Sequence, residues 1–154
     1  MSEKHLVSLK DVEEASKRLQ GIIRPTIMVH AGWLERLIDK PVYLKPENLQ
    51  RAGSFKIRGA YNLMSQLSDA DKKKGVVAAS AGNHAQGLAL AGKRYGLQTH
   101  IFMPEGTSEV KTRKTEELDA TIHFVGSVFD ESLTAAKAFA DENKERVFVS
   151  PYED

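Results

Sequence analysis

The alternation of strand-like and helix-like segments after Gly75 constrains the fold of this chain most strongly. Buried strands are indicated by four short apolar runs, at 76–79, 99–103, 121–125 and 147–149. Helical patterns separate these runs, at 83–95, about 108–118 and 129–143. Strands that alternate with helices through short connections favour parallel strands with helices on both faces. The sequence therefore predicts an α/β fold, a three-layer parallel sheet flanked by helices.

The region before Gly75 is organised differently. Apolar residues at helical spacing predict a helix over 9–19, with Ser8 as N-cap and Asp11 three residues further on. Three further elements are predicted before residue 50, two short strands and a turn of helix: 26–29, 42–44 and about 33–37. A longer helix is predicted over 54–67, and the lysines at 72–74 are interpreted as a solvated turn.

Composition excludes several classes of function. The 154 residues suffice for about one domain. The 22 basic and 21 acidic residues are intermixed along the chain and give a net charge of +1. Neither nucleic acid nor a membrane is therefore an expected partner. The absence of cysteine excludes disulfides and thiolate catalysis, and the histidines lack metal-ligand spacing, so no metal site is predicted. No stretch has the character of a signal peptide or a membrane span, which makes the protein cytoplasmic by expectation.

Two segments carry the residues from which chemistry can be expected. In the first, 47–60, Lys56 lies between Phe55 and Ile57, just after Ser54, a candidate helix N-cap. A lysine in partly apolar, cationic surroundings can lose its proton and attack a carbonyl carbon. For this residue taken alone, a solvated surface lysine is the alternative.

The second segment, Ser80 to Gly87, is typical of a strand-to-helix turn built from small residues. A helix start presents unpaired N–H groups and a favourable dipole to an anion, and a glycine such as Gly82 lets the backbone approach closely. The segment therefore favours the binding of a carboxylate. The alternatives are that Asn83 simply caps the following helix and that His84 is a half-buried polar residue.

Together the two segments resemble the threonine/serine dehydratases. Glu47-Asn48-Leu49-Gln50 followed by Gly53-Ser54-Phe55-Lys56-Ile57-Arg58-Gly59-Ala60 is similar to the cofactor-lysine motif of that family, and Ser80-Ala81-Gly82-Asn83-His84-Ala85-Gln86-Gly87 resembles its substrate-carboxylate loop. These enzymes are fold-type II, tryptophan-synthase-β-like, and depend on pyridoxal 5′-phosphate (PLP). The resemblance extends from about Arg24 to Asp154 in the same order and spacing, and implies that architecture for this chain.

The resemblance also implies a role for each residue. Lys56 would form the internal aldimine with PLP and later take the α-proton of the substrate. Phe55 would lie near the cofactor ring, core packing being the alternative. Asn83 would donate a hydrogen bond to the phenolic oxygen of PLP, and Arg58 is expected in a structural ion pair rather than near the phosphate. The substrate carboxylate would be bound by five consecutive residues: Ser80, Ala81, Gly82, Asn83 and His84.

The implied function is dehydration and deamination of L-threonine, and of L-serine, by β-elimination. The products would be 2-oxobutanoate or pyruvate and ammonia, in isoleucine biosynthesis or in threonine catabolism. Ala81 occupies the position where serine racemases of the family commonly carry an acid/base serine, which disfavours a racemase. That reaction, other fold-type II reactions and a non-catalytic small-molecule-binding α/β domain stay open as alternatives.

The chain ends at Asp154, where roughly the first half of a dehydratase would end. We therefore expect an N-terminal portion of a longer enzyme, with residues 1–50 in the large PLP domain and residues 51–154 in a small α/β domain that carries the cofactor lysine and the substrate loop. The glycine-rich loop around the cofactor phosphate would follow Asp154, so this portion alone is expected to bind PLP weakly and to be inactive. The full-length protein is expected to be a homo-oligomer.

Overall fold

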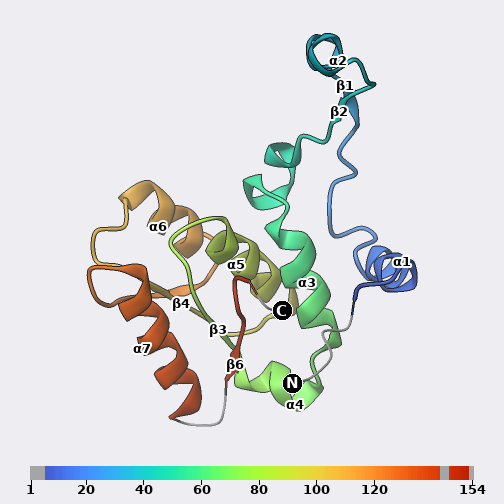
Figure 1. The fold of residues 1–154 in the computed structure, drawn as a ribbon. Coiled ribbons are helices and arrows are strands. Elements are labelled where there is room, and N and C mark those ends of the chain that lie inside the picture. The colour runs from blue at the N-terminus through green and yellow to red at the C-terminus, as the bar shows by residue number, and fades with distance from the viewer. Residues whose placement is uncertain (1–5, 143–145, 153–154) are drawn as a thin grey trace.

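A four-stranded parallel sheet forms the centre of the α/β part of the chain. The computed structural model describes residues 6–142 and 146–152 (Figure 1). The strand order is β5-β4-β3-β6, and the strands have the bounds β3 (Val76–Ala79), β4 (Thr99–Met103), β5 (Thr121–Phe124) and β6 (Val147–Phe148). Val76 lies opposite Thr99 on one side and Val147 on the other. The parallel sheet predicted from the sequence is thus confirmed.

Helices cover both faces of this sheet. The helices that follow β3, β4 and β5 are α5 (Asn83–Tyr95), α6 (Glu109–Glu116) and α7 (Phe129–Asp141). Val76 and Ala78 pack into a core with α5, while Val77 and Ala79 face the opposite way and pack with α7. All four residues of β3 are fully buried, which explains why this strand is a continuous apolar run rather than an alternating one. The structure therefore has the three expected layers.

The helix α3 (Lys56–Gln66) packs on the outside of α5. Three of its residues, Ile57, Ala60 and Met64, are buried in the same core as the inner face of α5. They are spaced three and four residues apart, so one stripe of α3 faces inward. This packing brings the first residue of α3, Lys56, next to the first turns of α5. The N-terminal helix α1 (Leu9–Arg18) lies against α3.

A separate arm projects from the body of the molecule (Figure 1). It consists of β1 (Val29–His30), α2 (Gly32–Ile38) and β2 (Tyr43–Leu44), and its two strands pair antiparallel. Its large apolar side chains are mostly exposed: Ile27, Met28, Val29, Trp33, Leu37, Ile38, Tyr43 and Leu44. We call residues 26–45 the arm.

Polar contacts of the residues that flank the arm hold its base to the body. The buried Gln50 accepts a hydrogen bond from the Arg24 backbone N–H and donates one to the Arg24 carbonyl, both at 2.8 Å. Glu47, in the 3₁₀ turn η1 (Glu47–Leu49), binds the guanidinium of Arg58 on α3. A second 3₁₀ turn, η2 (Arg51–Gly53), leads into α3.

Several expected element bounds differ from the structure. The lysines at 72–74, expected in a turn, belong to α4 (Asp69–Lys74), because the Ser68 hydroxyl caps this helix by accepting from the Asp71 N–H at 3.0 Å. The strand expected at 26–29 is β1 at Val29–His30, where pairing with β2 begins. The helix expected from residue 54 begins at Lys56. The end expected for the helix 129–143 lies outside the described residues. Within the described ranges, no helix has both the length and the apolarity needed to span a membrane.

Candidate active site

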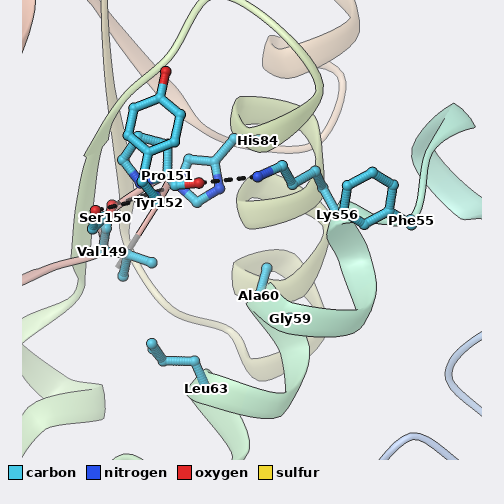
Figure 2. Close-up of a pocket in the computed structure, with 10 residues that line it drawn as sticks. All are labelled: Phe55, Lys56, Gly59, Ala60, Leu63, His84, Val149, Ser150, Pro151 and Tyr152. Carbon is cyan, nitrogen blue, oxygen red and sulfur yellow. Dashed lines mark hydrogen bonds between the residues drawn. The ribbon is translucent and has the colours of Figure 1, made fainter. Parts of the chain in front are cut away.

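Lys56 lies in a pocket of about 290 Å³ between the start of α3, the start of α5 and the segment after β6 (Figure 2). Its lining is contributed by ten residues: Phe55, Lys56, Gly59, Ala60, Leu63, His84, Val149, Ser150, Pro151 and Tyr152. Most of these residues are apolar or contribute backbone, and Lys56 and His84 are the basic side chains of the lining. Carboxyl ends of parallel strands are common locations for ligand sites in α/β proteins, and β6 ends here.

The amino group of Lys56 points across this pocket to the segment after β6. Lys56 Nζ donates a hydrogen bond to the Pro151 carbonyl at 3.0 Å and lies 5.6 Å from the centroid of the Phe55 ring. Within the described part of the chain, Lys56 forms no ion pair with a carboxylate. The amine is therefore positioned by a neutral backbone group, which leaves it available to a ligand.

His84 is the second polar side chain of the pocket. It is buried on the first turn of α5, at 8% exposure, with Nε2 3.4 Å from the Val149 carbonyl. Burial lowers the pKa of His84, and the nearby charge of Lys56 lowers it further, against the opposing effect of the hydrogen bond to Val149. The imidazole is thus kept neutral beside the lysine.

Phe55 lines the mouth of the pocket and is 57% exposed. The alternative that it packs in the core is therefore wrong. Its backbone conformation is already helical, and it immediately precedes α3 without a side-chain cap. The cap-like contact comes instead from Ser54, whose hydroxyl accepts from the Lys56 N–H at 3.4 Å.

The strand-to-helix turn after β3 presents backbone groups rather than side chains. The N-cap of α5 is Gly82, which has no side chain with which to cap the helix. The Ser80 hydroxyl accepts a hydrogen bond from the Gly82 N–H at 3.2 Å. The alternative that Asn83 caps this helix is wrong, because Asn83 is its first helical residue. The first N–H groups of a helix lack intrahelical partners, so this turn offers donors to an anion.

The predicted site residues do not all share one pocket. Phe55, Lys56 and His84 line the pocket just described. Asn83 is exposed and lines a neighbouring hollow of about 610 Å³ with Gln86, Lys111 and Lys114. The turn residues Ser80, Ala81 and Gly82 lie between β3 and α5 and do not line the lysine pocket. The structure therefore brings together the lysine and the histidine, with Asn83 at the adjacent surface.

Sequence reasoning missed the groups after β6. The carbonyls of Val149 and Pro151 hold His84 and Lys56, and Tyr152 covers one side of the pocket. Every residue has a carbonyl, so these contacts carry no sequence signal. The expectation for Arg58 is confirmed, since it forms an ion pair with Glu47 whose side chains are 28% and 17% exposed.

The residues present fit a cofactor that carries an aldehyde. A primary amine condenses with an aldehyde, and Lys56 Nζ lies in a partly apolar pocket beside a neutral imidazole. The nearby start of α5 offers N–H groups to an anionic substrate.

The chain belongs to the family of pyridoxal-phosphate dependent enzymes, whose family model matches residues 19–154. It is 43% identical over 149 residues to the L-threonine ammonia-lyase of Thermotoga maritima, covering 97% of this chain and 37% of that protein. Its fold superposes with a TM-score of 0.83 on the processed threonine deaminase isoform 2 of Solanum lycopersicum, at 33% identity over 96% of this chain and 42% of the other. The serine racemase of Dictyostelium discoideum gives a TM-score of 0.86, at 32% identity over 96% and 48% of the two chains. The chain spans less than half the length of these relatives, and the predicted fold-type II architecture and PLP dependence are confirmed at the level of the family.

Proposed function

We propose that this chain is part of a lyase that converts L-threonine, and L-serine, into 2-oxobutanoate or pyruvate and ammonia by β-elimination. The position of Lys56 carries the proposal. Its amino group faces into the pocket, bound to a backbone carbonyl and adjacent to the buried His84 (Figure 2). The names of the Thermotoga and Solanum relatives support threonine as the substrate.

Seven residues are proposed to hold cofactor and substrate. PLP, when bound, supplies an aldehyde for the lysine and a conjugated ring that accepts the electrons of a broken Cα–H bond. Lys56 would bind the aldehyde carbon, Phe55 would lie beside the ring, and Asn83 would donate to the phenolic oxygen. The substrate carboxylate would be bound at the Ser80–His84 turn, where the start of α5 presents unpaired N–H groups.

Lys56 is also proposed to take the proton from the substrate Cα. An amine accepts a proton only in its uncharged form. Burial lowers the pKa of His84, so the imidazole beside Lys56 is neutral and brings no positive charge into the pocket. The Pro151 carbonyl orients the amino group without neutralising a charge. Both contacts are compatible with an amine that exchanges a proton.

We further propose that residues 1–50 belong to a large domain and residues 51–154 form a small one. The projection of the arm from the α/β body and its exposed apolar side chains support this division (Figure 1). A cytoplasmic, homo-oligomeric enzyme of amino-acid metabolism is the corresponding proposal for the complete protein.

Reductive trapping tests the role of Lys56. The chain is incubated with PLP, reduced with borohydride and mapped by peptide mass spectrometry, with Lys56→Arg as the control. We expect the label on the peptide that contains Lys56 and its loss in the control. Label spread over exposed lysines such as Lys10, or no label, would instead support a non-catalytic binding domain. Because the chain spans less than half of its relatives, we expect negligible 2-oxobutanoate formation from threonine by the chain alone.

Racemisation is the second candidate, favoured by the similarity to the Dictyostelium serine racemase. Racemisation requires a proton donor on the face of the substrate opposite the lysine. Ala81 has no group that can donate or accept a proton, and it packs against the hydrophobic core. Incubation of a protein containing this chain with L-serine separates the two reactions, since the lyase yields pyruvate and the racemase yields D-serine.

A further inference from the structure

A glycine on α5 forms the contact directly beneath Lys56. A Cβ atom added to Gly87 would lie 2.9 Å from the Lys56 carbonyl carbon, 3.0 Å from the Ile57 backbone nitrogen and 3.0 Å from Lys56 Cβ. Gly87 is buried, one turn after His84. The start of α3 thus rests on the one position of this α5 turn that has no side chain.

The atoms that would meet such a Cβ cannot rotate away. Two of the three belong to the backbone of Lys56 and Ile57, and the third is the first side-chain carbon of Lys56. Non-bonded carbon atoms ordinarily lie about 3.5–4.0 Å apart, so the start of α3 would have to move by about 0.5–1 Å.

The surrounding core cannot absorb this movement locally. Ile57 and Met64 on α3 and Ala85 and Leu88 on α5 are each fully buried. Interiors at this density transmit a displacement rather than take it up in voids. The first turn of α3 would therefore shift away from α5 and carry Lys56 with it.

We propose that Gly87 is a positioning residue for Lys56. Its missing side chain lets α3 begin against α5, which places Lys56 Nζ within reach of the Pro151 carbonyl and beside His84. Gly87 does not line the lysine pocket and acts through the lysine. This inference rests on the proposed function, in which the lysine holds PLP.

Three alanine variants test the inference. Gly87→Ala introduces the displacement. Gly92→Ala introduces a clash elsewhere on α5, with Cβ 2.0 Å from the side-chain atom Thr99 Oγ1 and away from the backbone of α3. Gly106→Ala adds a methyl group where no atom lies within 4 Å, and is the neutral control. Urea unfolding measures the stability of each variant. Sucrose, which favours the folded state, is added where a variant is partly unfolded.

Two readouts are taken at Lys56. The first is the rate of borohydride-trapped PLP labelling, which we expect to fall about tenfold in Gly87→Ala, since a displacement of about 1 Å can cost a reacting group up to about 100-fold in rate. The second needs no cofactor: the rate of acylation of Lys56 by a small reagent, divided by that of the exposed Lys10 in the same sample. We expect this ratio to rise severalfold, because Nζ loses the Pro151 carbonyl.

The outcomes separate position from stability. Support for the inference is a change of the acylation ratio in Gly87→Ala together with wild-type ratios in Gly92→Ala and Gly106→Ala. Wild-type ratios in folded Gly87→Ala, or equal changes in Gly92→Ala, would overturn it. Absence of PLP label from Lys56 in the wild-type chain would count against the proposed function alone, because the acylation ratio still reports the position of the lysine.

Discussion

Glu47 and Arg58 are joined by two parallel hydrogen bonds, from Arg58 Nε to Oε2 at 2.8 Å and from Nη2 to Oε1 at 2.7 Å. Thr26 donates a further hydrogen bond to Glu47 at 2.6 Å. Arg58 is two residues beyond Lys56, so this ion pair fixes the first turn of α3 to the segment that follows the arm. The hydrogen bonds from Arg58 are the main reason why the pKa of Glu47 is lowered to about 2.

Glu47→Gln should destabilise the chain by about 1–3 kcal/mol, because Arg58 would stay partly buried without its charged partner. The measurement is the free energy of unfolding in urea at neutral pH. Since the folded-state pKa of Glu47 lies below its ordinary value of 4.5, the wild-type advantage should be complete above that pH and should disappear as the pH falls toward about 2.

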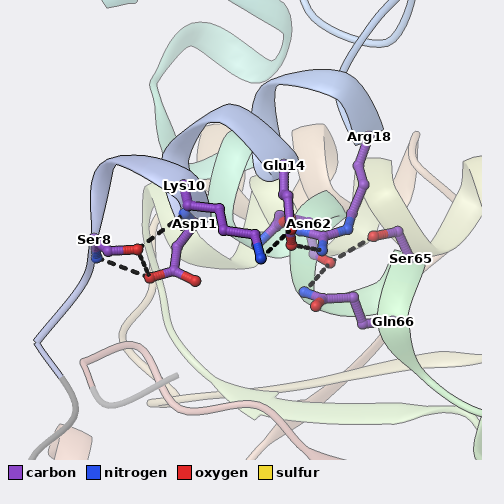
Figure 3. A network of polar contacts seen from close by, with 8 residues as sticks. All are labelled: Ser8, Lys10, Asp11, Glu14, Arg18, Asn62, Ser65 and Gln66. Atoms are coloured by element: carbon purple, nitrogen blue, oxygen red, sulfur yellow. Dashed lines mark hydrogen bonds and ion pairs between the residues drawn. The ribbon is translucent and has the colours of Figure 1, made fainter.

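The matched control for this variant lies on α1. Glu14 pairs with Arg18 at 3.4 Å, and Arg18 also donates to Asn62 on α3 (Figure 3). Because the Glu14 side chain is 43% exposed, Glu14→Gln should cost less than about 0.5 kcal/mol. Equal losses in the two variants would contradict a special role for the Glu47–Arg58 pair.

Gln50→Ala should cost about 2–3 kcal/mol, because the buried amide of Gln50 satisfies both the N–H and the carbonyl of Arg24. Urea unfolding measures the loss. The exposed Gln66, which donates to the Asn62 carbonyl at 3.0 Å, provides the comparison, and Gln66→Ala should change stability by less than about 0.5 kcal/mol. A loss below 1 kcal/mol for Gln50→Ala would show that water replaces both hydrogen bonds.

Gly75→Ala should be markedly more destabilising than Gly96→Ala. Gly96 is in the left-handed helical region (φ +67°, ψ 29°), which costs an alanine about 1–2 kcal/mol, whereas Gly75 (φ +80°, ψ 178°) lies in a region that is open almost only to glycine. At Gly75 the added Cβ would also lie 2.7 Å from the Gln98 carbonyl oxygen, whereas at Gly96 nothing lies within 4 Å. The difference between the two urea midpoints measures the clash at the start of β3 together with the less accessible backbone conformation of Gly75, and identical midpoints would contradict both.

Acid should destabilise the sheet through His100 and His123. His100 Nδ1 lies 3.1 Å from His123 Nε2 on neighbouring strands, and both rings pack against Phe139 of α7. Burial lowers the pKa of both, and the charge of Arg146 lowers each further. Since the unfolded chain takes up protons near pH 6.5 and the folded one resists them, stability should fall as the pH drops below that value.

The double variant His100→Phe, His123→Phe should remove much of this slope. Phenylalanine keeps the ring contacts with Phe102 and Phe139 and cannot bind a proton. The measurement is the urea midpoint at several values between about pH 7.5 and about pH 5. A slope as steep as that of the wild type would assign the acid sensitivity to other groups.

The sheet was the part of the fold most accessible from sequence. The bounds of β3, α5 and β4 agree with those expected from apolar runs and from Gly96, because strands buried on both faces leave an unbroken apolar signal. The charged α4 has no such signal. Its indications were the Ser68 cap, an acidic first turn and a basic last turn, and the run of three lysines was interpreted as a solvated turn.

The candidate site was only partly predictable for a related reason. The motif around Lys56 and the turn with His84 identified three side chains that do share a pocket, those of Phe55, Lys56 and His84. The backbone carbonyls of Val149 and Pro151, and the close approach at Gly87, depend on how distant segments pack together. Side-chain chemistry can be recognised in a sequence, but main-chain contacts between remote segments cannot.

Trp33, the single tryptophan of the sequence, belongs to α2 of the arm, is 58% exposed and does not line the lysine pocket. Figure 1 shows α2 at the tip of the arm, projecting from the α/β body. Its emission should therefore be that of an indole in water, and filling the pocket should leave the wavelength unchanged. A shift to the blue would signal that another surface has covered the arm. Intrinsic fluorescence thus distinguishes assembly of this chain from occupation of its site, without an added label.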